Sequence, residues 1–356
     1  MRIALKSSIG KGIQFFVFLG LFSCLSQIDF PVDIKGGVLV VTGRISTIAD
    51  QNIIELGRTA ETERLPEPLS GASIEVFDEF GRVAVYSEIE TGVYEAHNVI
   101  GTVGRTYHIE IKLPNGSFYK SKPERMPAAS GLDLIQYEVV EEKVVDFEGI
   151  PTSKMFYKIY ANSTLDSRNT YLKWRVTEAF LLSPTDFPDP FGSIPPPCFI
   201  VQNADPQRIV SIDAGKLATT QLKRQLIASR EIDWSFLEKH YFSTYQSSIT
   251  KDAFEYWRKV DILANQVGSI FDSPPAEISG NLICVSDPLE KVLGFFQACN
   301  ETFIRKDFYP SDLPFDLRPL VSKCDFTGNT DPLSYKSRCI NCIDVRNSSY
   351  QRPSWF

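Results

Sequence analysis

The stretch that decides the fold is Thr106-Tyr107-His108-Ile109-Glu110-Ile111. Its apolar side chains alternate with polar ones, which is the period of a strand buried on one face. Pro114-Asn115-Gly116 follows it and leads into Phe118-Tyr119-Lys120. Glycine tolerates the positive φ that tight turns need, so these residues predict a β-hairpin with one buried face.

Other short segments rich in strand-forming residues precede this hairpin. They lie at 38–41, 52–56, 73–77, 83–86 and 92–95, and the turn Asp78-Glu79-Phe80-Gly81 separates two of them. About seven short strands over 38–121 are typical of an immunoglobulin-like or transthyretin-like β-sandwich. We therefore assign residues 37–130 to an N-terminal β-sandwich domain.

A second β-rich domain is expected over residues 131–356. Strand signals recur at 137–140, 154–160, 170–176, 281–286 and 292–298, and the last two are expected to form a hairpin about residue 289. One inserted α-helix is predicted at about 250–266, because apolar residues recur there at spacings of three and four. Thr250 can cap its start and Gly268 its end.

A proline-rich segment interrupts this second domain. Residues 183–197 carry six prolines, which cannot belong to a central strand because each removes a backbone donor. Phe187 and Phe191 lie among these prolines. Aromatic side chains on a rigid loop form a low-entropy contact surface, so both are candidates for contact with a partner. The alternative is that both rings pack beneath the loop.

The N-terminus is typical of a lipoprotein leader. Arg2, Lys6 and Lys11 precede a short apolar run, which ends in Leu21-Phe22-Ser23-Cys24. A bilayer-spanning helix needs about 20 apolar residues, and this run is too short. We expect a signal peptide at 1–23, acylation of Cys24 with chains such as palmitate, and a tether at 24–36. The alternative is an ordinary secreted protein in which Cys24 is incidental.

Composition and charge exclude some classes of partner. The chain has 356 residues with a net charge of −7, and the leader holds three basic and no acidic residues, so the mature chain would carry −10. Nucleic-acid binding needs a basic surface, so no nucleic-acid partner is expected. With 43% hydrophobic residues the chain can bury more than one core.

Six cysteines remain beyond Cys24. They are Cys198, Cys284, Cys299, Cys324, Cys339 and Cys342. In an oxidising compartment an even number predicts up to three disulfides, and six cysteines allow 15 connectivities. Cys284 and Cys299 are not expected to be direct cross-strand partners. The pair Cys339-x-x-Cys342 could instead be a redox pair or half of a zinc site, but export favours disulfides and no metal.

No catalytic pattern stands out. His97, His108 and His240 are the only histidines, and none sits in a motif that would supply orienting partners. The acidic pairs Glu141-Glu142 and Asp78-Glu79 suit solvated positions better than a paired-carboxylate site, because neighbouring strand residues point to opposite faces. We therefore expect no enzyme activity and no cofactor.

Several motifs resemble those of one family. They are Val-Thr-Gly-Arg at 41–44, Ser-Gly-Ala-Ser-Ile-Glu-Val at 70–76, Gly-Val-Tyr-Glu-Ala at 92–96, Gly-Thr-Val-Gly-Arg-Thr-Tyr at 101–107, Ala-Phe-Glu-Tyr-Trp at 253–257, Gly-Ser-Ile-Phe-Asp at 268–272 with Pro274-Pro275, Gly280-Asn281, Val-Leu-Gly-Phe-Phe at 292–296, Cys-Ile-Asn-Cys at 339–342 and Arg-Pro-Ser-Trp-Phe at 352–356. Their order resembles the Bacteroidota lipoproteins of "domain of unknown function 4249".

The resemblance implies a location and a partner, and no catalytic residues. It implies a lipid-anchored outer-membrane protein. The cell surface is favoured over the periplasmic face, but both stay open, because the segment after Cys24 holds only Asp29 and Asp33 in place of the dense acidic run associated with surface export. The implied partner is a TonB-dependent outer-membrane barrel, for which the chain would be a non-catalytic accessory aiding substrate capture or gating. The alternative is a structural or assembly subunit of another envelope complex, and an envelope enzyme is least favoured.

Overall fold

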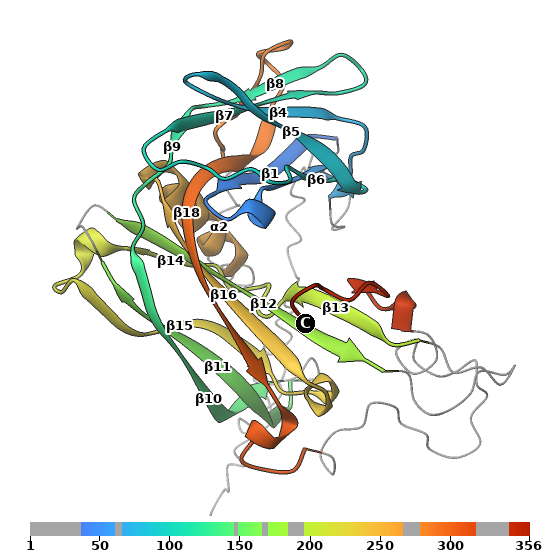
Figure 1. The fold of residues 1–356 in the computed structure, drawn as a ribbon, viewed down its shortest axis with the longest axis vertical. Helices are drawn as coiled ribbons and strands as arrows, with labels where there is room; N and C mark the ends of the chain where they lie inside the picture. Colours follow the sequence, from blue (N-terminus) through green and yellow to red (C-terminus); the bar gives the residue numbers. More distant parts are fainter. Residues whose placement is uncertain are drawn as a thin grey trace, which may run out of the picture. The chain divides into compact units, whose positions relative to one another are not determined.

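Strands make up most of the chain that the computed structural model describes, namely residues 37–60, 66–145, 149–165, 170–183, 196–265, 278–317 and 342–356 (Figure 1). A long mixed sheet runs in the order β17-β8-β7-β4-β5-β6-β2-β1-β18-β16-β12-β13-β19, and a second sheet has the order β10-β11-β15. The prediction of a mainly β, sandwich-like fold is confirmed.

The first core is built mainly by the strands of the N-terminal segment. They are β1 (Leu39–Ser46), β2 (Ile53–Arg58), β3 (Glu67–Pro68), β4 (Ser73–Asp78), β5 (Gly81–Glu90), β6 (Val93–Glu95), β7 (Thr106–Lys112), β8 (Phe118–Ser121) and β9 (Glu124–Arg125), with the 3-10 turn η1 (Ala49–Gln51). Tyr107, Ile109 and Ile111 of β7 are buried, as their alternation predicted. The β7–β8 hairpin turns at Gly116, which has a φ of +90°.

The expected hairpin of residues 281–286 with 292–298 is wrong. Strand β17 (Leu282–Cys284) pairs antiparallel with β8, and so it extends the sheet of the first core. The contact with β18 is made instead by the side chain of Asn281, which bonds the backbone of Phe296 where a hairpin would have backbone-to-backbone hydrogen bonds. Its Nδ2 donates to the Phe296 carbonyl at 2.7 Å and its Oδ1 accepts from the Phe296 amide at 2.9 Å.

Two glycines allow the backbone to pass closely at this point. A Cβ on Gly294, which has a φ of +100°, would lie 1.9 Å from the carbonyl oxygen of Val41. A Cβ on Gly280 would lie 1.5 Å from the carbonyl oxygen of Gly294. Any side chain at either position would therefore separate the backbones that build this junction.

Strand β18 (Val292–Phe308) contributes to two cores. Its first half pairs in parallel with β1, and its second half pairs antiparallel with β16 (His240–Ile249). Phe296 and Ala298 belong to the first core, whereas Phe308 belongs to the second.

The second core lies between the three-stranded sheet and the distal part of the long sheet. Its further elements are β10 (Gly131–Val145), β11 (Pro151–Thr164), β12 (Tyr171–Leu182), β13 (Cys198–Asn203), β14 (Val210–Asp213), β15 (Gln221–Glu231), η2 (Ala214–Lys216), η3 (Trp234–Leu237) and η4 (Pro310–Asp312). Tyr157 is central to it, because its ring contacts those of Phe236, Phe242 and Phe308 at centroid distances of 5.1–6.0 Å.

The predicted helix is present as α2 (Lys251–Asn265), the α-helix of the described residues. The Thr250 hydroxyl accepts from the Ala253 amide at 3.2 Å and so caps its start. Ala253 and Phe254 are buried against Phe295 of β18. Only the first turns of the helix are buried, and the expected end cap at Gly268 lies outside the described residues.

Candidate functional site

Several of the predicted site residues lie outside the described part of the chain. These are Cys24, Phe187, Phe191, Cys324 and Cys339. The expectations attached to them, an acylated anchor, a partner-contact loop and further disulfides, remain predictions.

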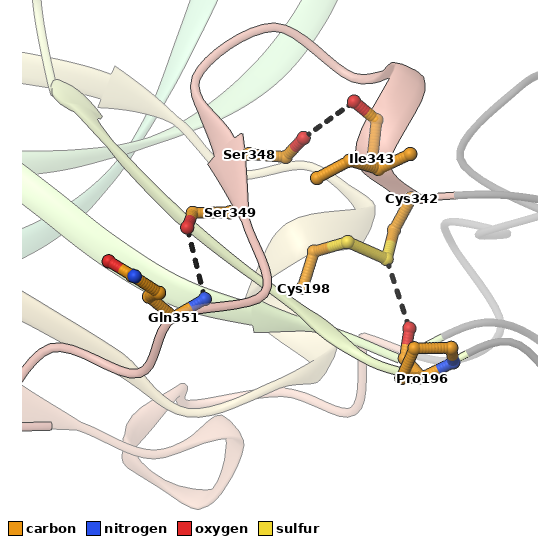
Figure 2. Close-up of a disulfide and its surroundings, with 7 residues drawn as sticks. All are labelled: Pro196, Cys198, Cys342, Ile343, Ser348, Ser349 and Gln351. Atoms are coloured by element: carbon orange, nitrogen blue, oxygen red, sulfur yellow. Dashed lines mark hydrogen bonds between the residues drawn. A yellow bond between two sulfur atoms is a disulfide. The ribbon is translucent and has the colours of Figure 1, made fainter. Parts of the chain in front are cut away.

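One disulfide joins Cys198, at the start of β13, to Cys342 in the 3-10 turn η6 (Cys342–Asp344). Figure 2 shows this bond beside Pro196, whose carbonyl oxygen lies 3.3 Å from Cys342 Sγ. Just after it, β19 (Ser348–Ser349) pairs with β13. The disulfide therefore fastens the C-terminal segment to the edge of the long sheet.

The six cysteines allow up to three disulfides, but two of them are unpaired in the described part of the chain. Cys284 and Cys299 carry buried free thiols. The Cys284 thiol donates to Glu290 Oε2 at 3.4 Å, within β17 and the turn after it. Cys299 lies in the middle of β18, where burial raises the pKa of its thiol to about 12. Such a thiol is unreactive at neutral pH.

The three histidines lie apart from one another and each has a local structural neighbour. His97 is near Glu95, and His108 stacks on Phe77 at 5.3 Å. His240 is buried among phenylalanine rings, and this burial lowers its pKa to about 3. No cluster of three or more metal-ligating side chains occurs within the described ranges.

A group of charged side chains gathers on one face of the long sheet. In β12 the even-numbered residues from Leu172 to Val176 are buried in the second core, so Lys173 and Arg175 point to the opposite face. Lys173 pairs in register with Ser247 of β16, which pairs with Glu301 of β18. Cross-strand partners share a face, so these side chains form one row.

Strand β1 supplies a third cation to this face. Its odd-numbered residues fill the first core, and Arg44 points the other way, opposite Gln297 of β18. Both Arg44 and Arg175 donate to Gln51 Oε1, at 3.2 and 2.7 Å. The Nε of Arg44 is buried and has no hydrogen-bond partner among the described residues.

Glu301 is the carboxylate within this group. Its oxygens accept from the hydroxyls of Ser46 at 2.7 Å and Ser247 at 2.8 Å, and Arg175 Nη2 lies 3.8 Å away. Burial acts to raise the pKa of Glu301, but Arg44, Arg175 and the two hydroxyls outweigh it and the net pKa is lowered. Glu301 is therefore ionised at neutral pH.

Helix α2 covers these charged side chains on the face of the sheet to which they point. The Lys173 ammonium lies 3.5 Å from the centroid of the Trp257 ring, and Trp257 Nε1 donates to Gln297 at 2.8 Å. Burial and the nearby guanidinium groups of Arg44 and Arg175 lower the pKa of Lys173 to about 7. Lys173 therefore changes its charge near neutral pH.

These side chains line a cavity of about 290 Å³. Its wall includes Arg44 and Thr42 of β1, Lys173 and Arg175 of β12, and Trp257 of α2. This volume is just below the range for small-molecule sites, about 300–1,000 Å³, and so suits only a small ligand. A small number of polar side chains that converge on a cavity with an aromatic side chain in its wall is typical of ligand-binding sites.

A model of the family described as "Domain of unknown function (DUF4249)" matches residues 26–305. This match covers 280 of the 356 residues and includes every residue of the cavity named above. The chain belongs to the DUF4249 family.

No curated protein matches this member of the DUF4249 family. Its described residues include no helix that is long and apolar enough to cross a membrane. The matched region ends before the described C-terminal segment and its Cys342, so the disulfide lies partly outside it.

The sequence alone did not predict this cavity. Its cations come from strands more than 120 residues apart, and each looks by itself like a solvated strand residue. A signal was nevertheless present, because Arg44 and Trp257 lie in two of the motifs on which the family resemblance rests, at 41–44 and 253–257.

Proposed function

We propose that this DUF4249 protein is a non-catalytic, lipid-anchored subunit of the outer membrane, held through Cys24. In this proposal it assists a TonB-dependent transporter by capturing a small solute. The anchor is supported by the leader-like residues 1–23 and the partner by the family resemblance. Capture is supported by the cavity between β1, β12 and α2.

The observation that carries the proposal is the convergence of charged and aromatic side chains on this cavity. Lys173, Arg175 and Arg44 face it, and Trp257 forms part of its wall. These groups can hold a solute, whereas a hydrolytic or transfer reaction needs a nucleophile with an adjacent base. A binding role therefore suits these side chains better than a catalytic one.

The experiment is isolation of the lipidated protein from outer membranes, with identification of the proteins that accompany it. A TonB-dependent barrel recovered in constant ratio is the expected result. The matched control is Cys24→Ser, which is expected to abolish acylation and membrane sedimentation. Recovery of a different envelope complex in constant ratio would contradict the transporter role, and an acylated, membrane-bound Cys24→Ser protein would contradict the anchor.

A further inference from the structure

We propose that the solute is a small oxyanion with two negative charges, a dicarboxylate or a phosphate, held by Arg44, Lys173 and Arg175. The identity of the ligand class deepens the proposed function and rests on it for its role in the cell. The binding itself depends only on these residues and can be tested without any transporter.

The first step is the balance of charge within the group. Arg44, Lys173 and Arg175 line the cavity, whereas Glu301, whose carboxylate lies 3.8 Å from Arg175 Nη2 and offsets one of these charges, does not line it. Glu55 also contributes to the wall but is exposed, and Asp205 is paired with Arg208 at 3.2 Å. The inner wall therefore has an excess of two positive charges when Lys173 is protonated, which matches a dianion.

The second step is the state of each cation. Within the described residues no carboxylate lies within ion-pair distance of the Lys173 ammonium, which rests instead on the Trp257 ring. Arg44 keeps a buried Nε donor without an acceptor. Arg175 reaches Glu301 only at 3.8 Å and exposes 24% of its side chain. Among the described residues, therefore, none of the three cations has an acceptor for every one of its donors.

A buried ion pair outside the cavity, that of Arg230 and Glu178, provides a comparison, because its guanidinium is fully hydrogen-bonded within the protein. Arg230 Nε lies 3.0 and 2.9 Å from the two oxygens of Glu178, and its other nitrogens donate to Asp233 and Ser235. Every nitrogen of that guanidinium has a protein partner. The cavity cations lack this saturation, and an oxyanion would supply the missing acceptors.

The third step is geometry. Guanidinium groups hold carboxylate or phosphate through paired hydrogen bonds, while an ammonium acts as a point charge. Arg44 and Arg175 share the acceptor Gln51, which brings their guanidinium groups together. Lys173 lies two residues from Arg175 on the same face of β12. Two guanidinium groups and one ammonium can therefore reach a single small ligand.

The test is titration calorimetry of the full-length protein in detergent at pH 6.5, with succinate and with sulfate as separate probes. Sulfate stands in for phosphate because it is a dianion at this pH, where phosphate is mainly a monoanion. Potassium chloride of equal ionic strength and glucose serve as negative ligands. The variants are Lys173→Met, Lys173→Arg and Lys216→Met, where Lys216 is a surface lysine outside the cavity wall with 78% of its side chain exposed. Circular dichroism establishes that each variant is folded.

The expected result is saturable binding of at least one probe with a stoichiometry of one. Lys173→Met weakens it at least tenfold, because it removes a positive charge from the cavity wall. Lys173→Arg, which keeps a positive charge there, and Lys216→Met stay within about threefold of the unmodified protein. Binding of neither probe, or equal affinity in Lys173→Met, overturns the anion site. The transporter proposal is judged separately, by co-purification.

Discussion

The Lys173 ammonium lies 3.5 Å from the centroid of the Trp257 ring, although the two residues are 84 positions apart in the chain. This contact joins β12 to helix α2 directly over the cavity. An ammonium on a tryptophan face gains about 2 kcal/mol or more when it is desolvated. The ring thus holds the lysine in place while leaving its hydrogen-bond donors free for a ligand.

The disulfide is expected to stabilise the C-terminal segment. Replacing both Cys198 and Cys342 by Ser should lower the free energy of unfolding by about 2–5 kcal/mol, because the bond closes a long loop. Hydrogen exchange should increase first in residues 342–356. Urea denaturation and exchange mass spectrometry measure the two effects, with reduced unmodified protein as the control. An unchanged unfolding free energy would show that the β13–β19 contact alone holds this segment.

Glu124 should make stability depend on pH. Its carboxyl accepts from Thr250 at 2.6 Å, and burial raises its pKa from 4.5 to about 7. The pKa of Glu124 is therefore higher in the folded than in the unfolded protein. The contribution of its protonated carboxyl to the free energy of unfolding is complete below pH 4.5 and is lost as the pH rises through 7. At pH 8 the loss is about 3 kcal/mol, from the shift of about 2.5 units.

The variant Glu124→Gln tests this dependence, since it keeps an acceptor for Thr250 and carries no charge. Urea unfolding at pH 5 and pH 8 should show a smaller loss of stability with rising pH in this variant than in the unmodified protein. Parallel pH profiles for the two proteins would mean that Glu124 does not titrate in this range.

Removing one partner of the buried ion pair Glu178–Arg230 should lower the free energy of unfolding, because the charge that remains is desolvated and has lost its counter-charge. Glu178→Leu leaves a buried guanidinium without its carboxylate, so it should cost about 3–5 kcal/mol of stability. The double variant Glu178→Leu with Arg230→Met removes both charges and should recover most of this loss. A double-mutant cycle in urea gives the coupling energy. Additive losses would show that the two residues are energetically independent.

The proline-rich loop gives a prediction about the partner. Changing both Phe187 and Phe191 to Ser should lower co-purification with a TonB-dependent barrel while leaving the thermal midpoint within a few degrees. The comparison variant is Phe80→Ser, because Phe80 is 79% exposed in the turn between β4 and β5. A large fall in the midpoint would mean that the two rings are core residues, and unchanged co-purification would remove the loop from the interface.

Local patterns of the sequence predicted much of the fold. The alternation in 106–111, the glycine turn at 116 and the apolar spacing of the helix each depend on neighbouring residues, and each agrees with the structure. The pairing of β17 with β8 was missed because it joins segments about 160 residues apart. Close sequence spacing favoured a hairpin, whereas the Asn281 side chain and two tightly packed glycines decided the pairing.

The cavity could not be predicted for the same reason. A lysine and an arginine two residues apart on a strand predict a polar face, and water usually covers such a face. Here helix α2 covers it, and β1 adds Arg44 through parallel pairing with β18. Only the register of four strands shows that these charges meet.

Proton uptake during succinate binding shows whether the Lys173 amine becomes charged when an anion occupies the cavity. At pH 8 the amine of Lys173 is mainly neutral, because its pKa is about 7, whereas Arg44 and Arg175 are charged, Glu301 is ionised and Cys299 is a neutral thiol. Succinate is fully ionised at this pH and favours the charged amine.

Calorimetry in two buffers of different ionisation enthalpy measures this uptake. Binding is expected to take up close to one proton per site at pH 8 and little at pH 6, and Lys173→Met is expected to take up none at either pH. Succinate binding at pH 8 with no proton uptake, or with the same uptake in Lys173→Met, would contradict this expectation.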